Sequence, residues 1–172
     1  MAKVFEGIDD RLRAWIERQH MFFVATAPSG SEGHVNVSPK GPIGSLRILG
    51  PHALEYDDFV GSGAETGAHL RENGRICVMF CAFDGPPRIV RLHGRGDLIT
   101  HDAATAAGVR GVIRVEIDRV SDACGFGVPL MQVVGERPQR EAWLASHDDA
   151  SLREYMQRKN TTSIDGLPAF SG

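Results

Sequence analysis

The fold is decided by the stretch VNVSPKG, residues 35–41. From Val35 to Ser38 apolar and polar side chains alternate, which is the period of a half-buried strand. Pro39 fixes φ and has no N–H to donate, so we expect the strand to stop or bulge there. Lys40 then projects from a rigid corner, where a lysine beside a hydroxyl suits a phosphate. The sequence is equally consistent with Lys40 being an ordinary solvated lysine on the surface after a strand.

Working outward, the neighbouring segments predict an antiparallel β-protein. MFFVATA (21–27) and the turn PSGSEG (28–33) make residues 21–38 a hairpin. Further strands are predicted in SLRILG (45–50), ALEY (53–56), RICVMFCAF (75–83), RIVRLHGRGDLI (88–99) and GVIRVEIDRVSD (111–122). Helices are predicted at 8–19, 64–73, 101–107, 138–148 and 149–160. Six or seven short strands with mostly hairpin-length links favour a barrel or a sandwich.

Composition and charge limit the class of protein. The chain has 172 residues, 42% hydrophobic and 24% charged, so we expect one domain over residues 1–172. Its core should cover about residues 8–120, with C-terminal helices and a tail over 121–172. The net charge of −3 lacks the positive excess of a nucleic-acid-binding surface. No apolar run approaches the ~20 residues that span a bilayer, and the charged N-terminus is unlike a signal peptide. A cytoplasmic protein with no nucleic-acid or membrane partner is therefore expected.

The glycine-rich segment GSGAETGAHL (61–70) is a second candidate for binding a phosphate. The spacing of Gly61, Gly63 and Gly67 does not match the dinucleotide fingerprint, and no βαβ unit fits around it, so a Rossmann site is rejected. A glycine-rich turn that opens a helix still presents free backbone N–H groups to an anion. The competing interpretation is a plain helix start, capped by Ser62 or Glu65.

Basic side chains follow the strand predicted at 88–99. Period two puts Arg91, His93 and Arg95 on one face, where three basic groups meet solvent, acids or an anionic ligand. The adjacent acids Asp57-Asp58 and Asp148-Asp149 are expected in turns or at a helix start, as caps rather than as catalytic groups. The nucleophile, zinc-protease and CxxC motifs are absent from the sequence.

The order of these pieces resembles the pyridoxamine 5′-phosphate oxidase-like, FMN-binding split-barrel family. The resemblance covers about residues 8–120 and is carried by VNVSPKG (35–41), ENGRICVMF (72–80) and RLHGRG (91–96). GSGAET (61–66) and SIDGLPA (163–169) resemble an uncharacterised bacterial subgroup. The resemblance implies a mainly β protein with small helices, built as a six-stranded antiparallel Greek-key split β-barrel.

The resemblance also implies a cofactor and a partner. Two chains would form a homodimer with an FMN in each of two interface clefts, acting on a small-molecule substrate. The residues implied at the flavin or its phosphate are Val37, Ser38, Lys40, Ser62, Gly63, Glu65, Thr66, Arg88 and Arg91, with Arg91 taken from the same cleft or from the partner chain. The resemblance therefore implies an FMN-dependent oxidoreductase whose substrate and catalytic residues the sequence does not assign.

Two departures from the family bear on this function. Full-length oxidases of the family carry an Arg-Lys pair where this chain has Ala64-Glu65-Thr66. Glu65 would repel a phosphate dianion if it pointed inward. Either Arg91, Arg88 or Arg71 compensates, or Lys40 and backbone N–H groups hold the phosphate, or the bound species is not FMN. The family's C-terminal Arg-x-His signature is also missing, so vitamin B6 oxidation is not expected. A non-catalytic binder of flavin, deazaflavin or a tetrapyrrole such as heme, and a structural dimer with an empty cleft, are the alternatives.

Overall fold

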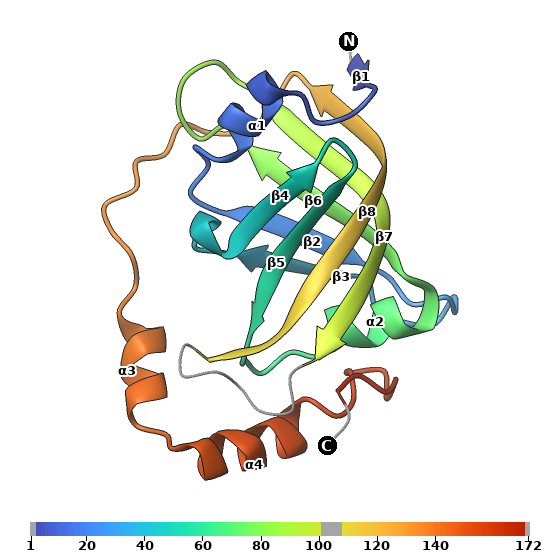
Figure 1. Cartoon of the computed structure of the whole chain (residues 1–172), viewed down its shortest axis with the longest axis vertical. Coiled ribbons are helices and arrows are strands. Elements are labelled where there is room, and N and C mark those ends of the chain that lie inside the picture. The colour runs from blue at the N-terminus through green and yellow to red at the C-terminus, as the bar shows by residue number, and fades with distance from the viewer. Residues whose placement is uncertain (1–2, 101–107, 171–172) are drawn as a thin grey trace.

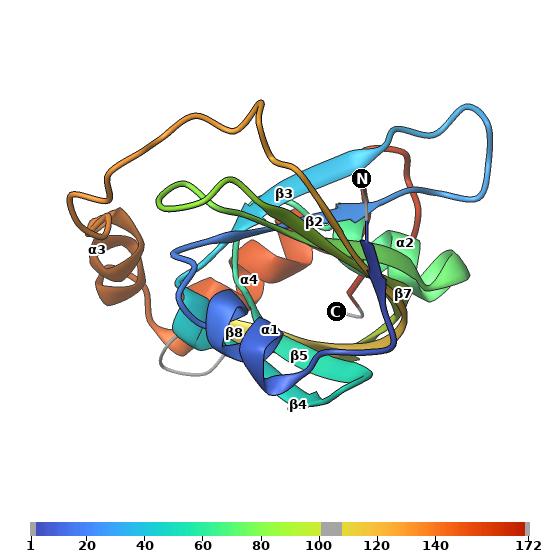
Figure 2. The same cartoon turned by 90° about the horizontal axis from the view of Figure 1, so that it is seen from above.

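One antiparallel sheet, curled on itself, forms the body of the protein (Figures 1 and 2). The computed structural model describes residues 3–100 and 108–170. The strands are β1 (Lys3–Phe5), β2 (Phe22–Thr26), β3 (Asn36–Lys40), β4 (Leu46–Gly50), β5 (Ala53–Phe59), β6 (Arg75–Cys81), β7 (Ile89–Thr100) and β8 (Val109–Ala123). Their order in the sheet is β3-β2-β6-β7-β8-β5-β4, with β1 added beside β8. The predicted mainly β, antiparallel barrel is confirmed, with eight strands among the described residues in place of six.

Helices sit at the ends of the barrel and beyond it. They are α1 (Asp10–Ile16), the short 3₁₀ turn η1 (Ile43–Ser45), α2 (Glu65–Asn73), α3 (Gln139–Ala145) and α4 (Asp149–Lys159). α1 begins where predicted, because the Asp9 side chain accepts a hydrogen bond from the Leu12 N–H at 2.7 Å. α2 ends at Gly74, whose φ of +71° is the left-handed conformation that glycine adopts without strain. The helix predicted at 101–107 lies outside the described residues.

The hairpin of β2 and β3 differs from the prediction at one residue. β3 does not stop before Pro39 but runs through it to Lys40, with Pro39 opposite Phe23. β3 is the last strand in the sheet order, so one side of its backbone needs no partner. A proline is tolerated in such an edge strand because its missing N–H removes no central ladder bond. Lys40 is therefore the last residue of a β-strand, whereas the sequence predicted it in a turn after the strand.

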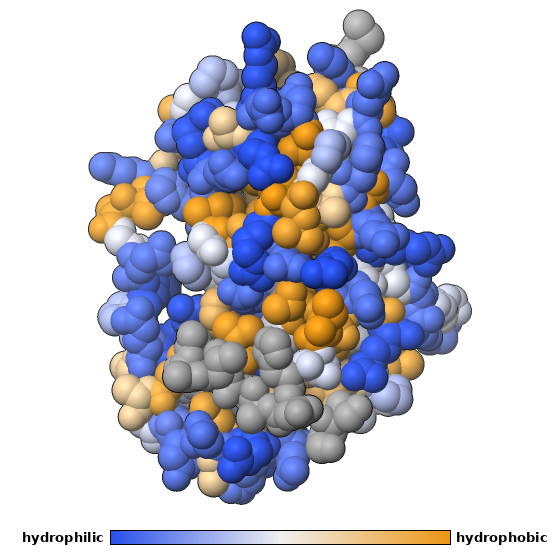
Figure 3. All heavy atoms as spheres, in the orientation of Figure 1, coloured by the Kyte–Doolittle hydropathy of each residue, from blue (hydrophilic) through white to orange (hydrophobic). Residues whose placement is uncertain are grey.

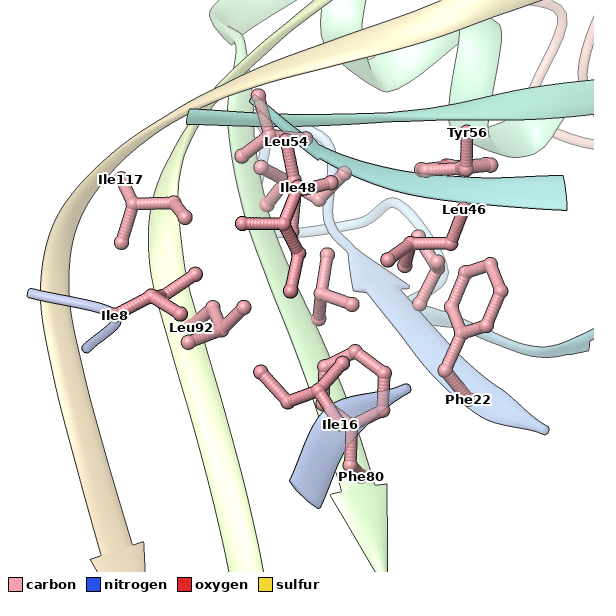
Figure 4. Packing of buried hydrophobic residues seen from close by; sticks show 14 of the residues in the cluster. Ile8, Ile16, Phe22, Leu46, Ile48, Leu54, Tyr56, Phe80, Leu92 and Ile117 are labelled. Atoms are coloured by element: carbon pink, nitrogen blue, oxygen red, sulfur yellow. The ribbon is translucent and has the colours of Figure 1, made fainter. Parts of the chain in front are cut away.

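Apolar side chains from β2 and from β4 to β8 meet inside the barrel, and α1 closes one end of it. Figure 4 shows Phe22 below Tyr56 in this cluster, and the centroids of the Phe22 and Phe80 rings lie 6.0 Å apart. The rings of Phe22 and Tyr56 meet edge to face, with centroids 5.3 Å apart. Each such buried side chain contributes about 1.5–3 kcal/mol to folding. This core is rigid enough to fix the strand faces that carry the candidate site.

The C-terminal part leaves the barrel and then returns to it. After β8 an extended arm, residues 124–138, leads to α3 and α4, which lie at the opposite end from α1 (Figure 1). A tail, residues 160–170, then packs Ala169 and Phe170 against Ala64 and Ala68 of the α2 start. The start of α2 is thereby held between the barrel and the tail. None of the helices in the described ranges is long and apolar enough to cross a membrane.

Candidate functional site

A small pocket lies at the seam where β3, β5, β8 and the start of α2 meet. Its volume is about 160 Å³. It is lined by Ser38, Lys40, Phe59, Gly61, Gly63, Glu65, Thr66 and Arg110. The proline stretch and the glycine-rich stretch, about 25 residues apart in the sequence, thus contribute to one wall. We call this the seam pocket.

The strand period decides which residues of β3 reach the seam pocket. Ser38 lies opposite Val24 and Lys40 opposite Phe22 on β2, and both of those partners point into the barrel core. Ser38 and Lys40 therefore face inward as well, because paired residues of neighbouring strands share a face. Val37 points to the opposite face and is 61% exposed, so it does not line the pocket.

One buried carboxylate connects the two cations of the pocket. Asp58 on β5 is 2% exposed; its Oδ1 accepts a hydrogen bond from Lys40 Nζ at 3.3 Å and its Oδ2 one from Arg110 Nε at 2.8 Å. Arg110 Nη2 donates to the Gly63 carbonyl at 2.9 Å. Arg110 Nη1 is buried and has no hydrogen-bond partner among the described residues. A buried guanidinium N–H without an acceptor is costly, so this donor could serve an anionic oxygen of a ligand.

A β-bulge aims Arg110 at the pocket. Asp58 pairs with Gly111 and Phe59 with Val109, so Arg110 is an extra residue on β8 with no partner on β5. Such a bulge re-aims a side chain that strict alternation would send to the other face. Sequence reasoning missed Arg110 for this reason. The expectation that Asp58 sits in a turn was also wrong, since it lies in β5, whereas Asp148 does cap α4 through the Ser151 N–H.

Glu65, the departure noted in the sequence, lines the seam pocket as well. Its Oε2 accepts a hydrogen bond from the Ala64 N–H at 3.1 Å, and its Oε1 one from the Ile164 N–H at 3.3 Å. The carboxylate thus accepts one hydrogen bond from the backbone at the start of α2 and one from the tail, and so links the two segments. Lys40, Arg110 and Glu65 line the pocket, and Asp58 lies behind the two cations, so these four side chains together have a formal charge close to zero.

A polar network continues from the pocket into the protein. Asn36 Nδ2 donates to Thr66 Oγ1 at 3.1 Å and to Thr26 Oγ1 at 3.2 Å, and Ser38 Oγ donates to Asn36 Oδ1 at 3.0 Å. Thr26 Oγ1 in turn lies 3.0 Å from His69 Nδ1 on α2. The hydroxyls of Ser38 and Thr66 are therefore held in place on the pocket wall by partners behind them.

His69 makes this network sensitive to acid. The His69 side chain is fully buried, and its Nε2 has no hydrogen-bond partner among the described residues. Burial lowers the pKa of His69 from the ordinary 6.5. The negative charges of Asp165, Glu72 and Glu65 act in the opposite direction but do not cancel this effect. Below about pH 6.5 the unfolded chain binds this proton and the folded chain resists it. Stability should therefore be full above pH 6.5 and fall as the pH drops below it.

We expect His69→Gln to reduce the slope of the free energy of unfolding against pH on the acid side. The reduction should be at most that of one proton, about 1.4 kcal/mol per pH unit. Urea unfolding between pH 7.5 and pH 5 measures the slope. His20→Gln, at an exposed position, is the matched control and should keep the wild-type slope. An unchanged slope in His69→Gln would remove His69 as the source.

The remaining residues implied by the resemblance lie elsewhere. Ser62 is exposed and does not line the seam pocket. Arg88 forms an ion pair with Asp122 at 3.1 Å and stacks on the Trp15 ring at 5.1 Å. Arg91 is half-buried on the outer face of β7, opposite Met79 of β6. The structure thus brings together Ser38, Lys40, Gly63, Glu65 and Thr66, and leaves Val37, Ser62, Arg88 and Arg91 outside the pocket.

The sequence that forms this barrel and its seam pocket also matches the profile of a known protein family. The profile of the family described as "Pyridoxamine 5'-phosphate oxidase" matches residues 8–124, so the chain belongs to the pyridoxamine 5′-phosphate oxidase family. A curated relative is the "Pyridoxamine 5'-phosphate oxidase family protein ustO" of Aspergillus flavus. It is 39% identical over 192 residues, covering 96% of this chain and 77% of the relative.

Solved structures support the fold. HupZ of Group A Streptococcus superposes with a TM-score of 0.52 at 20% identity, over 66% of this chain and 91% of HupZ. A protein of Mesorhizobium loti described as FAD-binding (mll6688) gives a TM-score of 0.47 at 12% identity, over 71% of this chain and 96% of that one. The first likeness shows a shared fold, and the second is too weak to bear on function.

Proposed function

We propose that the protein is a flavin-dependent oxidoreductase that binds the 5′-phosphate end of its flavin in the seam pocket. FMN, the nucleotide that the family resemblance implies, is the smallest flavin that meets this description. The observation that carries the proposal is the unpartnered, buried Nη1 of Arg110 in a pocket that Lys40 also lines, with both cations bonded to Asp58. Two cationic donors at one point are what a phosphate oxygen requires.

Different residues of the pocket would bind, orient and support that phosphate. Lys40 and Arg110 Nη1 would bind its oxygens, and the Ser38 and Thr66 hydroxyls, already fixed by Asn36, would orient it. Asp58 keeps both cations in place through direct hydrogen bonds. When bound, the flavin supplies the hydride chemistry, so the protein needs no acid–base pair of its own. The chain's part is to position the flavin and to keep water from it.

The flavin ring would lie outside the seam pocket. The pocket holds about 160 Å³, whereas a site for a whole ligand of this size is about 300–1,000 Å³. We propose that a second copy of the chain supplies the missing wall, so that the protein is a homodimer. Arg91 points outward from β7 and would meet the flavin of the other copy.

Exposed apolar side chains support this assembly. On the outer side of the β2–β3 hairpin, Val35 and Val37 are 72% and 61% exposed, and in the arm Leu130 and Val134 are 81% and 94% exposed. The arm's hydrophobic spheres protrude at the left edge of Figure 3. Light scattering on the purified protein should give twice the mass of the 18.7-kDa chain. A monomer at micromolar concentration would overturn the dimer.

An absorbance spectrum of the purified protein tests the function. Flavin bands that bleach with NAD(P)H and recover in air are the expected result. Flavin bands that cannot be turned over would leave a binding protein and remove the enzyme. A Soret band, a deazaflavin spectrum, or a colourless protein that takes up no added flavin would each contradict the proposal and select one of the alternatives.

Glu65→Gln should tighten flavin binding. The change removes one negative charge beside the phosphate. The amide oxygen of glutamine can still accept from one of the two N–H groups, Ala64 or Ile164, whereas the other loses its acceptor. We expect a three- to tenfold lower Kd, about 0.7–1.4 kcal/mol at a partly screened site. Fluorescence titration with FMN measures it. Glu72→Gln, on the same helix but not a pocket residue, is the control, and equal effects of the two variants would show a long-range charge effect only.

A further inference from the structure

The tail is folded back on itself beside the start of α2 (Figure 1). The Ala169 N–H donates to the Thr161 carbonyl at 2.9 Å. The Phe170 N–H donates to the Asn160 carbonyl at 3.1 Å. The Asn160 side chain is fully buried and donates to the carbonyl of Gly61, a pocket residue, at 2.8 Å. These bonds hold the Phe170 backbone in place beside a segment that lines the seam pocket.

The Phe170 ring occupies space that Gly67 leaves open on α2. Phe170 is 6% exposed, and a Cβ added at Gly67 would lie 3.1 Å from its Cε2 and 3.4 Å from its Cζ. The same Cβ would lie 3.0 Å from Leu98 Cδ2. Two carbon atoms in ordinary contact are farther apart than this. Gly61 and Gly63 line the pocket, whereas Gly67, the third glycine of the segment, makes room for the tail.

The same ring lies against the guanidinium of Arg110. The guanidinium carbon is 4.3 Å from the centre of the Phe170 ring, which is the distance of a cation–π contact. Arg110 Nε donates to Asp58 Oδ2 at 2.8 Å, and Nη2 donates to the Gly63 carbonyl at 2.9 Å. The guanidinium is thus held by β5, by the turn before α2 and by the tail. These contacts leave Nη1 without an acceptor among the described residues.

This arrangement prepares Arg110 for an anionic oxygen. Its side chain is only 5% exposed, so water has little access to the guanidinium, and the Phe170 ring is part of the cover. A long side chain that is already fixed loses little conformational freedom when it binds a ligand. Phe170 itself does not line the seam pocket. Any effect of Phe170 on a ligand there would therefore pass through Arg110.

We propose that Phe170 is a positioning residue of the seam pocket, which holds the Arg110 guanidinium so that Nη1 stays available to the phosphate of the ligand. This inference rests on the proposed function, because it assigns a role to a residue behind the same phosphate site. Phe170 and the rest of the tail lie outside the family match at residues 8–124. Phosphate affinity in this chain thereby depends on a segment that the family profile does not cover.

Titration of the purified protein with FMN and with riboflavin, followed by flavin fluorescence, tests this role. Phe170→Leu keeps an apolar side chain against α2 and removes the flat ring. We expect it to raise the Kd of FMN about fivefold, the effect of immobilising one long side chain on binding. The affinity for riboflavin, which has no phosphate, should not change. Phe170→Met also lacks the ring and should give the same phosphate-specific loss, so the test does not depend on one variant.

The matched control is Leu167→Ala, which removes another apolar tail side chain from the cluster at the start of α2. It should leave the affinities for FMN and riboflavin unchanged, and the urea midpoint of each variant reports whether the fold is kept. An unchanged FMN affinity in the Phe170 variants, an equal loss for FMN and riboflavin, or the same loss in Leu167→Ala would each overturn the positioning role and leave the proposed function standing. A wild type that binds FMN no more tightly than riboflavin, or binds neither, would overturn the proposed phosphate site itself.

Discussion

Arg110→Met should destabilise the folded protein by about 3–5 kcal/mol in urea unfolding without added flavin. The substitution leaves Asp58, 2% exposed, with Lys40 as its remaining ionic partner. Removing one member of a buried ion pair costs this much because the other charge stays in a poorly solvated position. It also removes the stacking of the guanidinium on Phe170, 4.3 Å away, which holds the tail.

The matched control is Arg114→Met on the same strand. Arg114 pairs with Glu55 at 3.0 Å, but its side chain is 53% exposed, so its loss should cost less than about 1 kcal/mol. The double variant Arg110→Met/Asp58→Leu should recover part of the loss, because no uncompensated acid remains. A cost for Arg110→Met no larger than that of Arg114→Met would show that the buried pair is not a structural element.

Local sequence patterns were enough to predict the parts of the fold that depend on neighbours along the chain. The β2–β3 hairpin follows from alternation around PSGSEG, and α2 ends at Gly74 because glycine adopts the left-handed φ there. The inward direction of Ser38 and Lys40 follows from period two once the buried partners Phe22 and Val24 are known. The hairpin and the end of α2 need no long-range information, whereas the direction of Ser38 and Lys40 also requires the burial of Phe22 and Val24.

The part of the site that could not be predicted depends on contacts between distant segments. Arg110 reaches the seam pocket through a bulge whose position is set by the register of β5 against β8. No single-strand pattern encodes that register. The tail contacts, from Ile164 to Glu65 and from Asn160 to Gly61, join residues 99 positions apart. The sequence offered Arg91, Arg88 or Arg71, or Lys40 with backbone N–H groups, to compensate for Glu65, whereas the pocket contains Lys40 and Arg110.

This position of Arg110 changes what the missing Arg-Lys pair means. The second cation of the seam pocket comes from β8 rather than from the start of α2, where Glu65 now satisfies the backbone N–H of Ala64. Lys40 is then the cation of the pocket that β3 itself provides. It is 22% exposed, held by Asp58 at 3.3 Å, and free to donate its two other N–H bonds.

Lys40→Met should accordingly weaken flavin binding by about 1.5–3 kcal/mol, or roughly 10- to 150-fold in Kd, because a charge-assisted hydrogen bond to the phosphate is lost. Methionine keeps most of the apolar stem, and Asp58 keeps Arg110 as a partner, so stability should fall far less than in Arg110→Met. Riboflavin, which has no phosphate, should bind the variant and the wild type equally, and this comparison isolates the phosphate contribution. Lys159→Met, at the exposed end of α4, should change neither affinity. If Lys40→Met and the wild type bound FMN equally, or if riboflavin lost as much affinity as FMN, Lys40 would not contact the phosphate and the seam pocket would not be its site.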